Sequence, residues 1–141
     1  MDLLAIDNEM TPIAKARRWV ENGRRVALAT VISTWGSSPR PVGSQLVINE
    51  EEAFFGSVSG GCIESTILTE AQFVIRDGHP QRLSIGIQDG KAWDYGLGCG
   101  GDVDIYVEPV DAWQPVLDTL TDLAKQRQSF CLITNLRDGS K

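Results

Sequence analysis

The sequence predicts an α/β (α+β) fold: a single domain, residues 1–141, in which a mixed β-sheet is flanked by about three helices. Three observations predict it. A chain of 141 residues is enough for one domain of ordinary size and too short for two. Hydrophobic periodicity alternates between helix-like and strand-like runs. Two of the strand-like runs are separated by a short charged turn, so at least one pair of strands is antiparallel.

The first predicted elements are a helix and a central strand. Thr11-Pro12 begins the helix, with a hydroxyl that can cap the first turn and a proline at the first helical position. Apolar residues recur at helical spacing until Asn22-Gly23 ends it. Residues 26–32, VALATVI, are almost uninterrupted by polar side chains, which suits a strand covered on both faces.

The alternation continues to the end of the chain. Strands at 45–48 and 53–58 are joined by the charged turn, and a helix with apolar residues at 63, 67, 71 and 74 ends near Asp77-Gly78. The remaining predicted elements are strands at 83–87 and 103–107, a helix capped by Asp111 with an apolar face at 116–123, and a strand at 129–134.

The composition excludes several classes of protein. The formal net charge is −6, whereas a dedicated nucleic-acid binder normally presents a basic face. No apolar run is long enough to span a membrane. The N-terminal MDLLAIDNEM lacks the basic region and apolar core of a signal peptide. We therefore expect a cytoplasmic protein with no nucleic-acid partner and no membrane span.

The cysteines and the histidine limit the chemistry further. Cys62, Cys99 and Cys131 are odd in number and far apart, which indicates free thiols in a reducing compartment. With no Cys-x-x-Cys pair and His79 as the only histidine, no zinc-finger site can be assembled. A Ser-His-Asp hydrolase would depend on His79, which lies in a predicted surface turn. Cys131 lies in an apolar strand pattern and is expected to be a small core residue.

The first of three unusual loops spans residues 34–44, TWGSSPRPVGS. Prolines on both sides of Arg40 restrict its backbone, and Ser37 and Ser38 offer hydroxyl groups. A guanidinium held in this way can bind a phosphate or another oxyanion. The alternative is an ordinary surface loop with a solvated arginine.

The second loop spans residues 56–64, GSVSGGCIE. Gly60 and Gly61 would let a ligand approach the backbone, and free amides at the start of the following helix would attract an anion. The same field would make the thiol of Cys62 more acidic and more nucleophilic. The spacing fits neither a P-loop nor a dinucleotide fingerprint. The alternative is a tight strand-to-helix turn with a buried cysteine.

The third loop spans residues 93–101, WDYGLGCGG. Its glycines expose the backbone around Cys99, while Trp93 and Tyr95 offer ring faces on which a flat heterocycle can stack. The alternative is a bulged turn. If the three loops converge at one edge of the sheet, they form a site for an anionic, heterocyclic ligand with one or two reactive cysteines. Thiolates suit a soft metal centre.

These segments resemble the XdhC/CoxI family of xanthine dehydrogenase accessory proteins. The resemblance covers roughly residues 13–110. It rests on residues 34–44 and 56–64, on Asp89 and Ala92-Trp93, and on residues 96–101 leading to Val107-Glu108-Pro109, in the family's order and spacing.

The resemblance implies a maturation factor that binds the molybdenum cofactor (molybdopterin) transiently, rather than an enzyme with catalytic residues. Such a factor assists sulfuration, protection and insertion of the cofactor into apo xanthine dehydrogenase or a related molybdenum hydroxylase such as carbon monoxide dehydrogenase. It implies a cysteine desulfurase as sulfur donor and leaves a homodimer open. The implied molybdenum contacts are Cys62 and Cys99. The implied cofactor-binding residues are Ser37, Ser38, Arg40, Gly60, Gly61, Cys62, Glu64, Cys99, Gly100 and Gly101.

The chain departs from the longer relatives, which carry a second, C-terminal Rossmann-like domain for which no room follows Lys141. Either that domain is a separate polypeptide, or the protein works without it. Residues 117–140 weakly repeat the pattern that precedes the first loop, so the chain is either complete or cut from something longer.

Two other functions stay open. The chain would be a thiol or redox protein if Cys62 were a nucleophile resolved by Cys99. It would be a structural docking module if a partner bound the basic residues of the first helix region; these charges equally suit a solvated face. Those residues are Lys15, Arg17, Arg18, Arg24 and Arg25.

Overall fold

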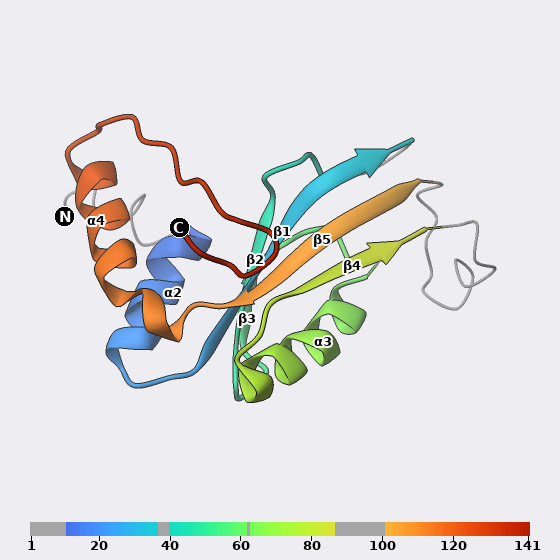
Figure 1. The fold of residues 1–141 in the computed structure, drawn as a ribbon, viewed down its shortest axis with the longest axis horizontal. Helices are drawn as coiled ribbons and strands as arrows, with labels where there is room; N and C mark the ends of the chain where they lie inside the picture. The colour runs from blue at the N-terminus through green and yellow to red at the C-terminus, as the bar shows by residue number, and fades with distance from the viewer. Residues whose placement is uncertain (1–10, 37–39, 62, 87–100) are drawn as a thin grey trace.

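A computed structural model describes residues 11–36, 40–61, 63–86 and 101–141. Its centre is a five-stranded sheet with the strand order β3-β2-β1-β5-β4 (Figure 1). The strands are β1 (Val26–Trp35), β2 (Gln45–Asn49), β3 (Phe54–Gly56), β4 (Gln81–Ile85) and β5 (Asp102–Pro109).

All four strand pairings among the described residues are antiparallel, so the prediction of a mixed sheet is wrong in this respect. The physical reason is the route of the chain between β3 and β4. These strands run in the same direction, but they lie at opposite edges of the sheet, and α3 (Glu64–Asp77) carries the chain from one edge to the other. Co-directional strands therefore never become neighbours. The predicted α+β class is confirmed, with three α-helices among the described residues.

Two helices begin and end as the sequence predicts. In α2 (Pro12–Glu21), the hydroxyl of Thr11 accepts a hydrogen bond of 3.2 Å from the amide of Ala14. In α3, Gly78 adopts a left-handed conformation with φ of 71°, and its amide donates to the carbonyl of Val74. The third α-helix, α4 (Gln114–Lys125), follows a short 3₁₀ turn, η2 (Asp111–Trp113).

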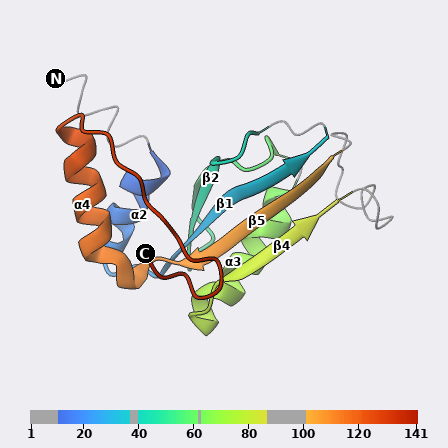
Figure 2. The same ribbon diagram turned by 45° about the horizontal axis from the view of Figure 1, so that its top comes forward.

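The helices cover the two faces of the sheet unequally, as the views in Figures 1 and 2 show. On one face, α3 packs along β1 and β5 through a large apolar cluster that includes Val31, Ile67 and Ile105. On the other face, α2 and α4 pack only against the part of the sheet where β1 begins. As predicted, the first half of β1 is buried on both faces. The second cluster consists of Ala16, Val26, Leu28, Val47, Val110 and Leu117.

Asp111 does not cap a helix. Its carboxylate accepts a hydrogen bond of 2.6 Å from the amide of Val26, and neither η2 nor α4 has a side-chain cap. The predicted cap is wrong because the carboxylate instead serves the amide at the start of β1.

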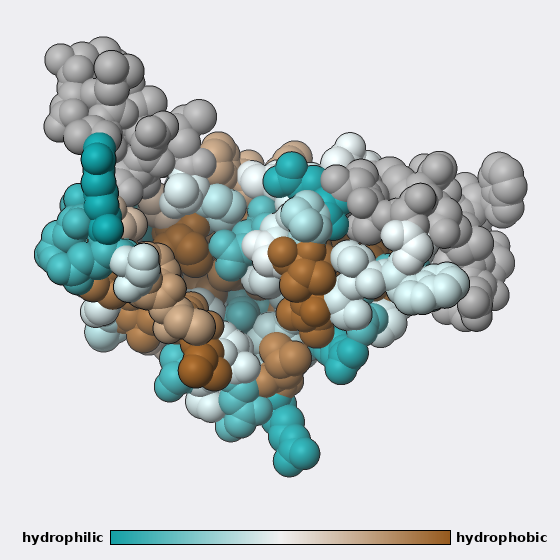
Figure 3. All heavy atoms as spheres, turned by 90° about the horizontal axis from the view of Figure 1, so that it is seen from above, coloured by the Kyte–Doolittle hydropathy of each residue, from teal (hydrophilic) through white to brown (hydrophobic). Residues whose placement is uncertain are grey.

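The predicted strand at 129–134 is also wrong, since none of the described strands pairs with this segment. Apolar alternation favours a strand but does not supply a pairing partner. Phe130 and Ile133 are 49% and 77% exposed, and Cys131 is exposed rather than part of the core. Seen from above, the surface of the molecule shows hydrophobic residues in separate groups between polar ones (Figure 3).

The tail returns to the sheet at Lys141. The ammonium group of Lys141 lies 2.5 Å from a carboxylate oxygen of Glu108, 2.9 Å from the hydroxyl of Thr134 and 3.6 Å from the ring centroid of Trp113. Burial raises the pKa of Glu108 and lowers that of Lys141, while their mutual attraction opposes both shifts. Among the described helices, none is long and apolar enough to cross a membrane.

Candidate functional site

The segments that follow β1, β3 and β4 leave the sheet toward the same end. These three strands run in one direction because each is separated from the next by an antiparallel neighbour. This end, on the right of Figure 1, lies away from α2 and α4. The three loops singled out in the sequence therefore follow strands that run in one direction, although the register places Gly56, the last residue of β3, level with Ala29 rather than with the end of β1.

The end of the first loop is hydrogen-bonded to β1. The amide of Gly43 donates to the carbonyl of Val31 over 2.8 Å, and the amide of Val31 donates to the carbonyl of Ser44 over 2.9 Å. Arg40, between these anchors and the end of β1, is exposed. The loop segment that contains Arg40 is therefore fixed to β1 at its base.

The second loop is organised by Glu64 at the start of α3. One carboxylate oxygen accepts hydrogen bonds from the Ser57 hydroxyl (2.7 Å), the Val58 amide (3.3 Å) and the Ser59 amide (3.1 Å). The other oxygen accepts from the Ser59 hydroxyl (2.5 Å) and the Gly61 amide (2.9 Å). Burial alone would raise the pKa of Glu64, but these hydrogen bonds outweigh it and lower the pKa to about 2. Glu64 is therefore ionised at neutral pH.

Two further amides of this loop are also occupied. The amide of Gly60 donates to the Ser57 hydroxyl over 2.9 Å, and that of Ile63 donates to the Ser59 hydroxyl over 3.0 Å. The amides of Val58, Ser59 and Gly61 thus bind an anion from within the chain, the Glu64 carboxylate, and binding of an external anion at the start of α3 stays a prediction. Gly60 and Gly61 have φ of 75° and 114°, so the turn itself requires glycine.

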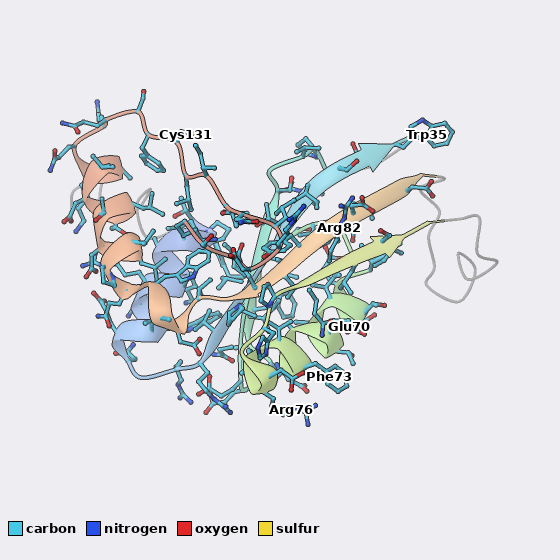
Figure 4. The ribbon with its side chains drawn as sticks, viewed as in Figure 1. Trp35, Glu70, Phe73, Arg76, Arg82 and Cys131 are labelled. Carbon is cyan, nitrogen blue, oxygen red and sulfur yellow. The ribbon has the colours of Figure 1, made fainter. Side chains whose placement is uncertain are left out.

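Of the third loop, residues 93–101, the structure describes only Gly101, together with the residues that follow it. Asp102 begins β5, and its carboxylate lies over Gly86, where an added Cβ would be 2.1 Å from a carboxylate oxygen. Across the sheet, Asp102 is paired with Trp35, the last residue of β1. The indole of Trp35 is 71% exposed and projects at the tip of β1 (Figure 4). Sequence analysis missed both as site residues, although Trp35 lies within the first loop's motif.

The predicted site residues divide between described and undescribed parts of the chain. Five predicted site residues lie within the described residues: Arg40 between β1 and β2, Gly60, Gly61 and Glu64 from the loop after β3 to the start of α3, and Gly101 directly before β5. The described part of the chain contains no group of three His, Cys, Asp or Glu side chains that could hold a metal ion. Outside the described residues lie Ser37, Ser38, Cys62, Cys99 and Gly100, so the meeting of the two thiols in one pocket stays a prediction.

Comparison with known proteins shows what this chain is similar to. The sequence model of the XdhC and CoxI family matches residues 19–86. The molybdenum cofactor insertion chaperone PaoD of Escherichia coli K12 is 30% identical over 145 aligned residues, which cover 94% of this chain and 45% of PaoD. A crystal structure described as a xanthine dehydrogenase from Bacillus halodurans matches with a TM-score of 0.68 and 27% identity, over 80% of this chain and 34% of that one.

This chain thus spans less than half the length of either relative. The family match contains two of the three glycine-rich loops, those that follow β1 and β3, and ends at Gly86. On the family match, the PaoD alignment and the shared fold, this chain belongs to the XdhC and CoxI family.

Proposed function

We propose that this chain binds the molybdenum cofactor and assists its maturation and insertion into a molybdenum hydroxylase. The observation that carries the proposal is the 30% identity to a molybdenum cofactor insertion chaperone across 94% of this chain. Xanthine dehydrogenase and carbon monoxide dehydrogenase represent the class of client enzyme that we propose.

The chemistry of the described residues is compatible with such a ligand. The cofactor combines a planar pterin, a phosphate and a metal held by sulfur. The exposed indole of Trp35 offers a surface for a planar ring, and Arg40, an exposed residue, carries a guanidinium group of the kind that binds phosphates. Cys62 and Cys99 remain the proposed contacts for the soft metal centre.

In this proposal the chain holds, shields and releases the cofactor, and the bound cofactor supplies its redox chemistry only in the client enzyme. Glu64 acts by holding the second loop in shape, so that loop is formed before the ligand arrives. The proposed cradle consists of Ser37, Ser38, Arg40, Gly60, Gly61, Gly100 and Gly101.

The finer features of the proposal follow the family resemblance. The protein is cytoplasmic and binds the cofactor transiently. Sulfuration of the bound cofactor uses sulfur delivered by a cysteine desulfurase. A homodimer is compatible with this scheme.

Cofactor content after purification tests the proposal. Protein from a molybdate-fed host should carry sub-stoichiometric molybdenum, measured by metal analysis, and pterin, measured by fluorescence after oxidation. Cys62→Ala and Cys99→Ala should each lower both contents. Cys131→Ala is the matched control, because Cys131 is exposed on the tail and should leave both unchanged. Pterin no higher than in an unrelated protein from the same host would contradict the proposal.

A further inference from the structure

Trp35 is exposed although it belongs to the central strand. It is 71% exposed, the highest value among the large aromatic side chains of the described residues, while the first half of the same strand is buried. Its backbone is fixed by the β1–β5 ladder, in which Trp35 pairs with Asp102. A large apolar ring is therefore held in solvent by a rigid element, and exposing it costs free energy unless a ligand covers it.

Asp102 lies beside this ring on the same face of the sheet, because directly paired residues of an antiparallel ladder share a face. Its neighbour Val103 belongs to the cluster under α3, so Asp102 and Trp35 lie on the opposite face. On that face, α2 and α4 pack where β1 begins, far from its end. The described helices therefore leave the Trp35–Asp102 pair open.

The carboxylate of Asp102 also lacks a partner within the described part of the chain. By contrast, Asp104, two residues further on the same face, is 2.5 Å from the guanidinium of Arg82. Gly86, the residue after β4, leaves room for the Asp102 carboxylate, which any side chain at position 86 would displace. The end of the sheet thus presents the exposed indole of Trp35 next to the carboxylate of Asp102, whose two oxygens can both accept hydrogen bonds.

We propose that Trp35 and Asp102 together bind a planar heterocycle that carries adjacent N–H donors, with the ring stacked on the indole and the donors bound by the carboxylate. This inference rests on the proposed function, in which the heterocycle is the 2-amino-4-oxo-pyrimidine part of the pterin. Its ring N–H and exocyclic amino group lie side by side, and a carboxylate accepts such a pair in two parallel hydrogen bonds. The negative charge of Asp102 also directs the cofactor's phosphate away from the pair.

Two small probes separate the roles of the residues. Pterin carries the 2-amino group, and lumazine has an oxygen in its place but the same bicyclic ring. In titrations followed by ligand fluorescence, the protein should bind pterin about tenfold more tightly than lumazine, because lumazine presents an acceptor to the carboxylate. Asp102→Asn should remove this preference. Trp35→Ala should weaken both probes by a similar factor, and Trp35→Phe should restore part of the affinity.

Gly86→Ala tests the carboxylate without removing it. The three atoms nearest to its added Cβ all belong to the Asp102 side chain, which can rotate away, so the variant should fold and still lose the preference for pterin. Phe73→Ala on α3 and Asp104→Asn are the aromatic and acidic controls, and both should retain the preference. Thermal unfolding of each variant confirms that it is folded.

The outcomes also separate this inference from the proposed function. If the protein copurifies with molybdenum and pterin but binds the two probes equally or not at all, the Trp35–Asp102 assignment is overturned and the proposed function stands. If it prefers pterin in the way described but never carries molybdenum, the heterocycle site stands and the cofactor proposal fails.

Discussion

The hydroxyl of Ser59 donates a 2.5 Å hydrogen bond to the carboxylate of Glu64 and accepts a 3.0 Å hydrogen bond from the amide of Ile63. The hydroxyl thus joins the loop after β3 to the first residues of α3. Ser59 is buried at 4% exposure, so water competes poorly with these hydrogen bonds. The turn is held by a network within the chain, which gives it a defined shape without a ligand.

Replacing Glu64 with Gln should destabilise the protein by about 2 kcal/mol, because the amide group that replaces one carboxylate oxygen cannot accept hydrogen bonds from Ser59 and Gly61. Chemical denaturation measures the change. Glu70→Gln on the same helix is the matched control and should change stability by less than about 0.5 kcal/mol. Equal stability of the two variants would show that the Glu64 network contributes nothing to the fold.

The contribution of Glu64 should depend on pH in a defined direction. Its pKa is about 2 in the folded protein and 4.5 as an unperturbed group, so between these values the unfolded state binds more protons. The stabilisation is complete above pH 4.5 and is lost as the pH falls toward 2. The stability difference between the wild type and Glu64→Gln, measured by urea denaturation, should therefore shrink through this range. A constant difference from pH 7 to pH 2.5 would contradict the assignment.

Gly56→Ala should destabilise the protein by about 3 kcal/mol or more. An added Cβ would lie 2.3 Å from the backbone carbonyl oxygen of Gln45, and φ at this position is 99°. Gly43→Ala is the matched control: it has a similar φ of 92° but nothing within 4 Å of the added Cβ. It should cost only about 1 kcal/mol from backbone strain. Thermal denaturation of the two variants separates close contact from strain, and similar losses would argue against the contact at Gly56.

Lys141→Met should cost about 3 kcal/mol at pH 7, because the carboxylate of Glu108 would remain buried without its partner. Burial already raises the pKa of Glu108, so lowering the pH should protonate the orphaned carboxyl and reduce the loss. Glu108→Gln combined with Lys141→Met should recover most of the stability. Arg82→Gln, which removes an exposed ion pair, should cost less than about 1 kcal/mol. A double variant no more stable than Lys141→Met would contradict this account.

Local signals predicted much of the fold. Thr11 and Gly78 mark helix ends through their own hydrogen bonds and backbone conformation, and the apolar run of β1 follows directly from burial on both faces. The order and direction of the paired strands, and whether residues 129–134 form a strand, depend on which strands are available as neighbours. Periodicity within one segment contains no such information, so the sheet was predicted as mixed and the tail as a strand.

The candidate site could be located from composition, but the roles of its residues could not. Glycines and serines at residues 56–64 correctly indicated an unusual loop before a helix. That its amides bind Glu64 became apparent only once the loop's geometry was known. Trp35 and Asp102 are 67 positions apart by number (102 − 35), and only the β1–β5 register brings them together.

The two helices that pack where β1 begins are separated from the end of the sheet that carries the loops. Tolerance to substitution should therefore differ along the molecule's length. Substitutions that improve packing between α2 and α4 should give a more stable protein for crystallisation or long incubations. Ligand binding at the opposite end of the sheet should stay unaltered. A library made to alter ligand preference should instead vary the residues that follow the ends of β1 and β4.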